Sequence, residues 1–235
     1  MFARTERLLL RPGWSEDAAA LLQAIRDERI VRNLATAPWP YGLADAEAFL
    51  ARERDPREAS SLIFMRTLGP PRLIGGIGFG RMPTGEVEFG YWIAQPYWGL
   101  GFATEAGRAA IANARHSLRL DRLVAGHFVD NPASGRVLRK LGFRPNGNTA
   151  LRYSAGRGTD APCRLFELDL AECEEALPRY GHFGECTKAW AESVSVAWNA
   201  STQKSQVTIR RAYIDRAHND RTATDAFEVA ARETR

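Results

Sequence analysis

The chain has 235 residues, of which 45% are hydrophobic and 26% charged, and its formal net charge is +4. These values are typical of a globular protein, so they exclude wholesale disorder, and the positive charge is too small to indicate nucleic-acid binding. No apolar run approaches the roughly 20 residues of a membrane-spanning helix. The three cysteines form no Cys-x-x-Cys pair, so we expect a reduced, cytoplasmic protein without a disulfide framework or zinc ribbon.

Hydrophobic periodicity and glycine and proline punctuation predict a mixed α/β domain, with a mostly antiparallel sheet flanked by helices. An apolar strand comes first and two helices follow it. Three strand-like runs then stand at hairpin distances, separated by Gly/Pro turns. A helix, a strand, a second helix and two strands complete the domain. The predicted segments are 7–11, 15–25, 45–54, 61–67, 71–80, 86–94, 101–116, 121–129, 131–143, 150–156 and 163–170.

The composition changes beyond Cys173, where Leu177 is the only leucine. We therefore predict a domain over residues 4–172 and a C-terminal extension of unknown role over 173–235, for which partial disorder is one alternative. Residues 189–202 fit a helix or a strand equally well, and 225–235 are typical of a terminal helix. Cysteine and histidine in the extension match no common zinc spacing, so we predict no metal site.

A short glycine-rich turn, Trp98-Gly99-Leu100-Gly101, joins a strand-like run to a helix-like run. Such turns hold phosphates in several folds, because exposed N–H groups and the helix dipole both favour an anion. A P-loop is excluded because Phe102 and Ala103, not Lys and Ser or Thr, follow Gly101. The dinucleotide fingerprint fits poorly, since Thr104 stands at its last position and the preceding strands are hairpin-connected.

The stretch Trp98–Ala103 resembles the pyrophosphate loop of the GCN5-related N-acetyltransferase (GNAT) family, Arg/Gln-x-x-Gly-x-Gly/Ala. Trp98 departs from the first position of that motif, and tryptophan there is similar to the RimJ/RimL-like branch of ribosomal-protein N-terminal acetyltransferases. Four further stretches point to the same branch in the correct order: "TERLLLRP", "GEVEFGYWI", "ATEA" and "NPASGRVLRKLGF". The resemblance covers residues 4 to about 172. It implies the GNAT fold, acetyl-CoA as donor and a primary amine as acceptor.

The resemblance also implies which residues bind coenzyme A. The backbone near Ile93 would polarise the thioester carbonyl, and Asn131 would contact pantetheine. From their place on the helix after "NPAS", Arg139 and Lys140 are predicted to meet the 3′-phosphate, with surface solvation as the alternative. For Asn131 a helix N-cap is an equally natural role, since Pro132 follows it. We interpret Arg136 on the same helix as a surface residue. The main chain that would hold the diphosphate comprises Trp98, Gly99, Leu100, Gly101, Phe102, Ala103 and Thr104.

An acceptor amine must lose a proton before it attacks, and a carboxylate acting through water can take that proton. Glu88 is the candidate base because the resemblance puts it on the strand beside the thioester. Glu86 competes with it, being two residues away on the same strand face. Either carboxylate could instead be an edge-strand charge that discourages aggregation. His127 is a further candidate base, but we favour a buried histidine with satisfied hydrogen bonds.

The departing thiolate gains from a proton donor, because the pKa of a thiol is about 8.5. Ser134 resembles the serine that this branch places near the sulfur of coenzyme A. It is predicted either as the catalytic acid or as a hydrogen-bond partner only. Tyr97 and Tyr153 are alternatives, because many members of the family use a tyrosine.

We predict an acetyl-CoA-dependent N-acetyltransferase in which the amine attacks directly within a ternary complex. A protein N-terminal α-amine and a small-molecule amine both stay open as acceptors, because "GFRPNGNTALRY" lacks the glutamate that often follows this point in the ribosomal-protein branch. The alternative function is a non-catalytic acyl-CoA-binding or regulatory module. We expect a monomer or homodimer, with no metal, nucleic-acid or membrane partner.

Overall fold

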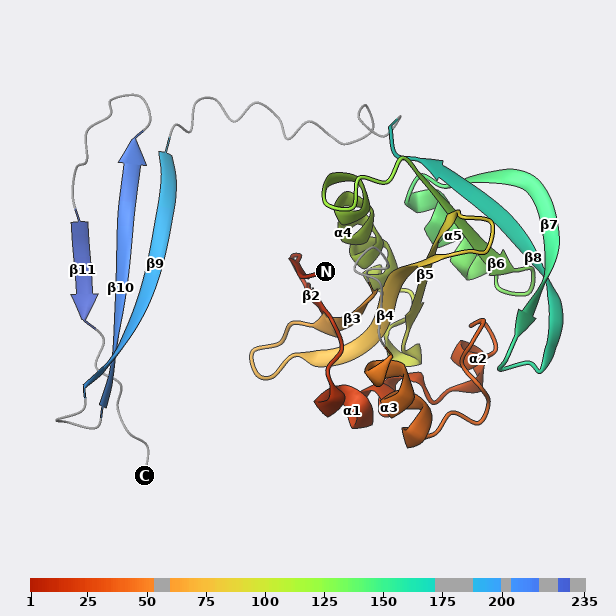
Figure 1. Ribbon diagram of the computed structural model, residues 1–235, viewed down its shortest axis with the longest axis horizontal. Helices are drawn as coiled ribbons and strands as arrows, with labels where there is room; N and C mark the ends of the chain where they lie inside the picture. Colours follow the sequence, from red (N-terminus) through yellow and green to blue (C-terminus); the bar gives the residue numbers. More distant parts are fainter. Residues whose placement is uncertain (53–59, 172–187, 200–203, 216–223, 229–235) are drawn as a thin grey trace. The chain divides into compact units, whose positions relative to one another are not determined.

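The computed structural model describes residues 1–52 and 60–171, together with the backbone of three strands at 188–199, 204–215 and 224–228. The chain divides into two compact units, Met1–Glu175 and Ala176–Arg235 (Figure 1). The boundary predicted at residue 172 lies outside the described residues.

The first unit contains one sheet of eight strands in the order β1-β2-β3-β4-β5-β6-β8-β7. Each neighbouring pair is antiparallel except β5 and β6, which run parallel. The predicted mixed, mostly antiparallel sheet is therefore confirmed. The strands are β1 (Ala3–Arg4), β2 (Leu8–Arg11), β3 (Ser60–Met65), β4 (Arg72–Arg81), β5 (Val87–Ile93), β6 (Arg122–Phe128), β7 (Arg144–Ser154) and β8 (Thr159–Asp169).

Helices cover both faces of this sheet (Figure 1). On one face α4 and α5 enclose a core that contains Phe89, Ile93 and Phe166. On the other face α1 and α3 pack over Leu62, Phe64 and neighbouring residues. The helices are η1 (Ser15–Asp17), α1 (Ala18–Ile25), α2 (Glu28–Val31), α3 (Leu43–Ala51), η2 (Gln95–Tyr97), α4 (Phe102–His116) and α5 (Pro132–Lys140). No helix that the structure describes combines the length and apolarity needed to cross a bilayer.

The parallel strands β5 and β6 diverge along their length. Within the described residues they share a single paired position, Glu88 opposite Val124, near the beginning of both strands. By contrast, β6 pairs with β8 continuously from Arg122 to Phe128. The divergence leaves the later part of β5 with an edge that is not covered by β6, and this opening positions the site described below.

Most predicted elements occur within a few residues of their expected bounds, but β7 begins at Arg144 rather than near residue 150. Pro145 and Gly147 are residue types that are uncommon inside a strand. The strand tolerates them because β7 is the last strand of the sheet and its register shifts between Pro145 and Thr149. The short helix α2 was not predicted.

The second unit forms a three-stranded antiparallel sheet in the order β11-β10-β9. Its strands are β9 (Lys188–Asn199), β10 (Lys204–Asp215) and β11 (Thr224–Glu228). The ambiguous stretch at 189–202 is therefore a strand over most of its length. The terminal helix predicted from residue 225 is wrong at its beginning, where the backbone pairs with β10 from Thr224 to Glu228.

Candidate active site

A cavity of about 540 Å³ occupies the opening between β5 and β6. Residues of α2, the loop before α4, α5, β7 and β8 complete its walls. The predicted site residues that line it are Glu88, Ile93, Trp98, Gly99, Gly101, Phe102, Ala103, Thr104, Asn131, Ser134 and Lys140. Leu100 and Arg139 do not line it. The structure thus brings together residues from strands and helices that are far apart in the sequence.

The loop before α4 presents a row of backbone N–H groups. Gly99 and Gly101 have φ of 78° and 83°, which an L-residue adopts only with strain. Phe102 begins α4, so the N–H groups of the first helical turn have no carbonyl four residues earlier in the helix. In the described part of the chain, the N–H groups from Gly99 to Thr104 donate no hydrogen bond. With the helix dipole, these groups favour an anion at this point.

The turn between β1 and β2 braces this loop from outside the cavity. Glu105 accepts hydrogen bonds from Thr5 Oγ1 at 2.6 Å and from Arg7 Nε at 2.7 Å. Arg7 also donates to the carbonyl of Leu100 at 3.1 Å. Burial acts to raise the pKa of Glu105, but these hydrogen bonds outweigh it and hold the pKa below its ordinary value. Leu100 therefore lies outside the cavity, and its carbonyl is held by the hydrogen bond from Arg7. The same contacts join two of the motifs that carry the resemblance, "TERLLLRP" and "ATEA".

Trp98 connects the loop to β5. Its Nε1–H donates to the carbonyl of Ile93 at 2.6 Å, so the indole lies against the uncovered end of this strand. The N–H of Ala94 donates to Ile74 on β4. Because the hydrogen-bonding direction alternates along an antiparallel strand, the N–H of Ile93 faces away from β4, toward the opening. Sequence reasoning noted Trp98 as a departure from the motif but missed this hydrogen bond.

Ser134 lies in the first turn of α5, where Asn131 is the N-cap. The Asn131 side chain accepts from the N–H of Ser134 at 3.3 Å, so the predicted capping role is confirmed. Tyr91 of β5 reaches across to this turn, and its hydroxyl lies 2.9 Å from Ser134 Oγ and 3.2 Å from the Ser134 carbonyl. Burial raises the pKa of Tyr91 to about 12, although the hydrogen bond with Ser134 acts in the opposite direction. Sequence reasoning missed Tyr91, whose only signal is its place in "EFGYW".

Glu88 forms an ion pair with Arg152 of β7, in which Arg152 Nη1 donates to Glu88 Oε1. The side chains are about one-third and one-quarter exposed, and both line the cavity. Arg152 was not predicted, because nothing local in the sequence relates it to a residue on β5. Glu86, the competing candidate base, lies in the turn before β5, where Thr84 donates to its side chain, and it does not line the cavity.

The remaining candidate acids and bases also lie at or near the cavity. His127 is buried on β6, and its Nδ1 lies 2.8 Å from the Phe128 carbonyl, which confirms the predicted satisfied histidine. Tyr97 and Tyr153 both line the cavity, and Tyr97 accepts a long hydrogen bond from Arg72. Cys163 on β8 is a buried free thiol, and its burial raises the pKa.

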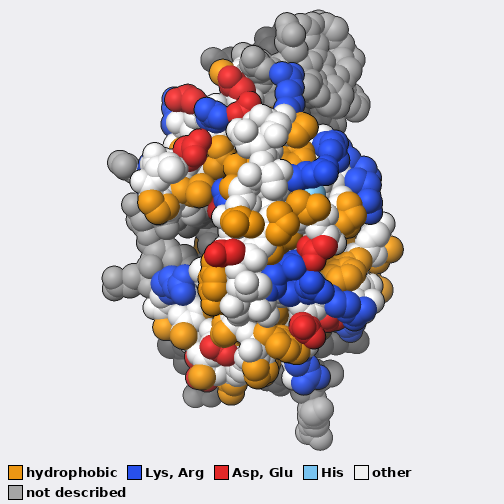
Figure 2. Space-filling view, turned by 90° about the vertical axis from the view of Figure 1, so that its right-hand side faces the viewer, with side chains coloured by type: hydrophobic (Ala, Val, Ile, Leu, Met, Phe, Trp, Pro, Cys, Tyr) orange, Lys and Arg blue, Asp and Glu red, His pale blue; other side chains and the backbone are white. Residues whose placement is uncertain are grey.

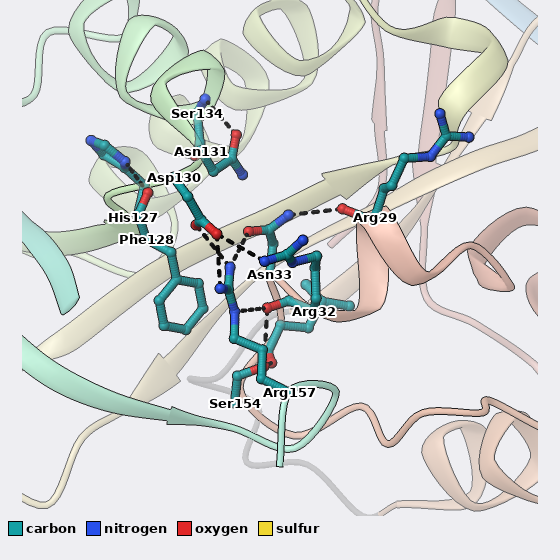
Figure 3. Close-up of polar contacts among 11 residues, drawn as sticks. Arg29, Arg32, Asn33, His127, Phe128, Asp130, Asn131, Ser134, Ser154 and Arg157 are labelled. Carbon is teal, nitrogen blue, oxygen red and sulfur yellow. Dashed lines mark hydrogen bonds and ion pairs between the residues drawn. The ribbon is translucent and has the colours of Figure 1, made fainter. Parts of the chain in front are cut away.

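A polar network joins the end of α2 to the turn after β6 and to the turn between β7 and β8 (Figure 3). Arg157, in the turn between β7 and β8, donates to both carboxylate oxygens of Asp130 at 2.8 Å. It also donates to the Arg32 carbonyl at 2.7 Å and to Asn33 Oδ1 at 3.2 Å. Arg32 contacts Asp130 at 3.0 Å. Since Arg29, Asn33 and their neighbours line the cavity, the network holds one of its walls in place.

Basic side chains dominate the charge at the cavity. The charged residues that line it, among those the structure describes, are Arg29, Arg136, Lys140, Arg152 and Glu88. Figure 2 shows a face of the molecule on which Lys and Arg side chains gather with fewer acidic groups between them. Arg139 lies instead with its guanidinium 5.6 Å from the Phe166 ring centre, and Arg136 takes a place at the cavity that was not predicted for it.

No group of three or more His, Cys, Asp or Glu side chains suited to a metal occurs among the described residues. Cys173, His182 and Cys186, considered above for zinc, lie outside the described residues.

Comparisons with known proteins agree with this architecture. Residues 7–144 match the acetyltransferase (GNAT) domain. The chain is 31% identical over 176 residues to the uncharacterised N-acetyltransferase YoaA of Bacillus subtilis, covering 70% of this chain and 94% of that protein. It is 38% identical over 73 residues to the ribosomal-protein-serine acetyltransferase of Escherichia coli, covering 30% of this chain and 41% of the relative.

A solved structure of RimL, the ribosomal L7/L12 α-N-protein acetyltransferase in complex with coenzyme A, has the same fold. Its TM-score is 0.59 at 18% identity, covering 72% of this chain and 97% of the RimL chain. The match over residues 7–144 and the similarity to most of the length of YoaA show which family the chain belongs to. The chain belongs to the GNAT family of acetyltransferases, and its similarity to the ribosomal-protein-serine enzyme supports the RimJ/RimL-like branch within it.

Proposed function

We propose that the protein transfers the acetyl group of acetyl-CoA to a primary amine by direct attack within a ternary complex. The observation that carries this proposal is the row of N–H groups from Gly99 to Thr104, which donate no hydrogen bond within the described residues and lie at a cavity between diverging strands. A diphosphate needs several donors that approach without side-chain obstruction, and this loop supplies them.

The rest of coenzyme A finds complementary groups along the same cavity. Pantetheine contains amides that can pair with the uncovered edge of β5, in the manner of an added strand. Asn131 lies beside that edge and retains its amide nitrogen as a donor. Arg136 and Lys140 on α5 line the cavity and supply positive charge for the 3′-phosphate. Arg136 therefore replaces Arg139 among the residues that we propose to bind the 3′-phosphate.

Acetyl-CoA supplies the activated acyl group, and the protein deprotonates the amine and stabilises charge. Glu88 accepts a proton from the acceptor ammonium, directly or through water. The nitrogen lone pair then attacks the thioester carbon, whose oxygen is stabilised by the N–H of Ile93. The C–N bond forms, the C–S bond breaks, and the electron pair leaves with sulfur. The second amine proton passes to the thiolate.

Tyr91 and Ser134 stabilise the departing thiolate. A phenol with a pKa of about 12 does not give up its proton to a thiolate whose conjugate acid has a pKa of about 8.5. A hydrogen bond from the neutral Tyr91–Ser134 pair is the contribution that fits these values. Ser134 is then a hydrogen-bond donor to sulfur, and Tyr91 is a positioning residue that orients its hydroxyl.

Direct attack is favoured over an acetyl-enzyme intermediate. Among the described residues, Cys163 is the thiol that lines the cavity, and burial raises its pKa. A thiol is nucleophilic as the thiolate, so a protonated buried cysteine is a poor acyl carrier. The acceptor takes the acetyl group without this intermediate.

A thiol-release assay with acetyl-CoA and a panel of peptides and small amines tests the proposal, together with acetyl-CoA binding by calorimetry. Gly101→Glu puts a carboxylate into the row of N–H groups and should abolish binding. Gly147→Glu is the matched control, because Gly147 has a similar φ of 82° and is a residue of β7 that does not line the cavity. Binding without thiol release from any amine would indicate the non-catalytic acyl-CoA-binding alternative. Absence of binding to the wild type would overturn the proposal.

A further inference from the structure

We infer that the acceptor is a small zwitterion, a primary amine that carries a carboxylate two or three bonds away, as a free amino acid does. This inference rests on the proposed function and specifies its acceptor. It starts from the Glu88–Arg152 ion pair, which no sequence motif indicates.

The pair joins opposite charges at the cavity wall. Glu88 comes from the beginning of β5 and Arg152 from the far part of β7. Their side chains remain 32% and 25% exposed, and both line the cavity. A molecule in the cavity therefore meets a carboxylate and a guanidinium side by side.

Arg152 has donor capacity left over in this arrangement. A guanidinium carries five N–H donors. Within the described part of the chain, Arg152 uses Nη1 for Glu88, and its other hydrogen bond runs from Nη2 to the thioether of Met82 at 3.9 Å. A thioether is a weak acceptor, so a carboxylate would replace it with a much stronger hydrogen bond.

The charge of the pair also separates two classes of acceptor. An ammonium group next to Glu88 leaves the carboxylate of the same amino acid next to Arg152, so each charge meets its opposite. In a peptide, the corresponding group beside the α-amine is a neutral amide. Leu34 and Trp92 supply apolar surface for a side chain. The site thus offers more to a free amino acid than to a protein N-terminus.

The test compares L-amino acids with their α-amides and with uncharged tripeptides of the same first residue, using thiol release at saturating acetyl-CoA. We expect kcat/KM for the best amino acid to exceed that for its amide by about ten-fold, the effect of a charge-assisted hydrogen bond. Arg152→Gln should bring this ratio close to one, and Arg152→Lys should restore it in part. Since amine pKa differs between an acid and its amide, the change in ratio between variants is the decisive number.

Arg164→Gln is the matched control, because Arg164 is an exposed arginine of β8 that does not line the cavity. It should leave the ratio unchanged. KM for acetyl-CoA, measured in every variant, reports on an intact donor site. Preference of the wild type for amides or uncharged peptides would overturn the inference while leaving the acetyltransferase proposal intact. An unchanged ratio in Arg152→Gln would also overturn it. If no acceptor caused thiol release, the proposed function itself would be overturned.

Discussion

Arg157→Ala removes the residue that joins α2, the turn after β6 and the β7–β8 turn. The side chain is 12% exposed and makes two hydrogen bonds to Asp130 and one each to the Arg32 carbonyl and Asn33. Its guanidinium also lies 4.5 Å from the centre of the Phe128 ring. Truncation therefore breaks four hydrogen bonds and one ring contact at once.

Two features reduce the cost. The Asp130 side chain is 49% exposed and can be solvated when its partner leaves, and the Arg32 carbonyl keeps a hydrogen bond from Ser154 Oγ at 3.1 Å. A hydrogen bond to a charged group contributes about 1.5 to 3 kcal/mol when buried and less at the surface, so we expect a loss of about 2 kcal/mol in the free energy of unfolding. Arg164→Ala, an exposed control, should change it by less than about 0.5 kcal/mol.

The stability effect should depend on pH. Hydrogen bonds from Arg157 are the largest cause that lowers the pKa of Asp130 in the folded state. A depressed carboxyl pKa stabilises the fold above the unfolded value of about 3.9, and this contribution is lost as pH falls through the folded pKa. The difference between wild type and Arg157→Ala should therefore be constant from about pH 5 to 8 and shrink below about pH 4.

Urea titration of the full chain gives the unfolding free energies, and steady-state kinetics give the functional effect. Because the network holds α2 and, among the described residues, makes no contact with the N–H row, KM for the acceptor should rise several-fold while KM for acetyl-CoA stays within about two-fold. A destabilisation below about 0.5 kcal/mol, or a rise confined to the acetyl-CoA KM, would refute this account of the network.

Three further predictions concern single contacts. Tyr91→Phe removes the hydroxyl that meets Ser134, so kcat should fall about ten-fold with an unchanged acetyl-CoA KM; an unaltered kcat would exclude a positioning role. Glu105→Gln weakens the contact with Arg7, so the KM for acetyl-CoA should rise about five-fold at pH 7. Urea titrations should also show a loss of stability. This loss should vanish below about pH 4, because the folded-state pKa of Glu105 is depressed. Gly107→Val should cost about 2 kcal/mol in unfolding free energy, because a Cβ there would lie 2.6 Å from Leu141 Cδ1; a thermal midpoint equal to the wild type would contradict this close packing.

Elements with local signals could be predicted from the sequence. Gly101 marks the beginning of α4, Asn131 and Pro132 mark the beginning of α5, and Gly142, with a φ of 92°, follows its end. The hairpins of β3, β4 and β5 follow from the Gly/Pro turns between them. These signals reside within a few residues of the structure they specify.

Features that depend on distant contacts escaped prediction. Four elements, η2, α4, β6 and α5, lie between Glu88 and Arg152 in the sequence. The two residues pair only because β7 folds back to the cavity that β5 also lines. Arg157 likewise contacts Arg32 and Asn33, which follow α2 and precede Arg157 by more than a hundred positions. A terminal helix was expected over residues 225–235, whereas pairing with β10 decides the conformation of its first residues.

The central claim is that the main chain from Gly99 to Thr104 binds the diphosphate of coenzyme A. Amide NMR of the ¹⁵N-labelled protein tests it directly, by titration with coenzyme A and, separately, with pantetheine, which lacks the diphosphate. We predict that coenzyme A shifts the N–H resonances of Gly99 through Thr104 and slows their exchange with solvent, and that pantetheine shifts β5 resonances but not these. Unchanged resonances in this loop at saturating coenzyme A would contradict the claim.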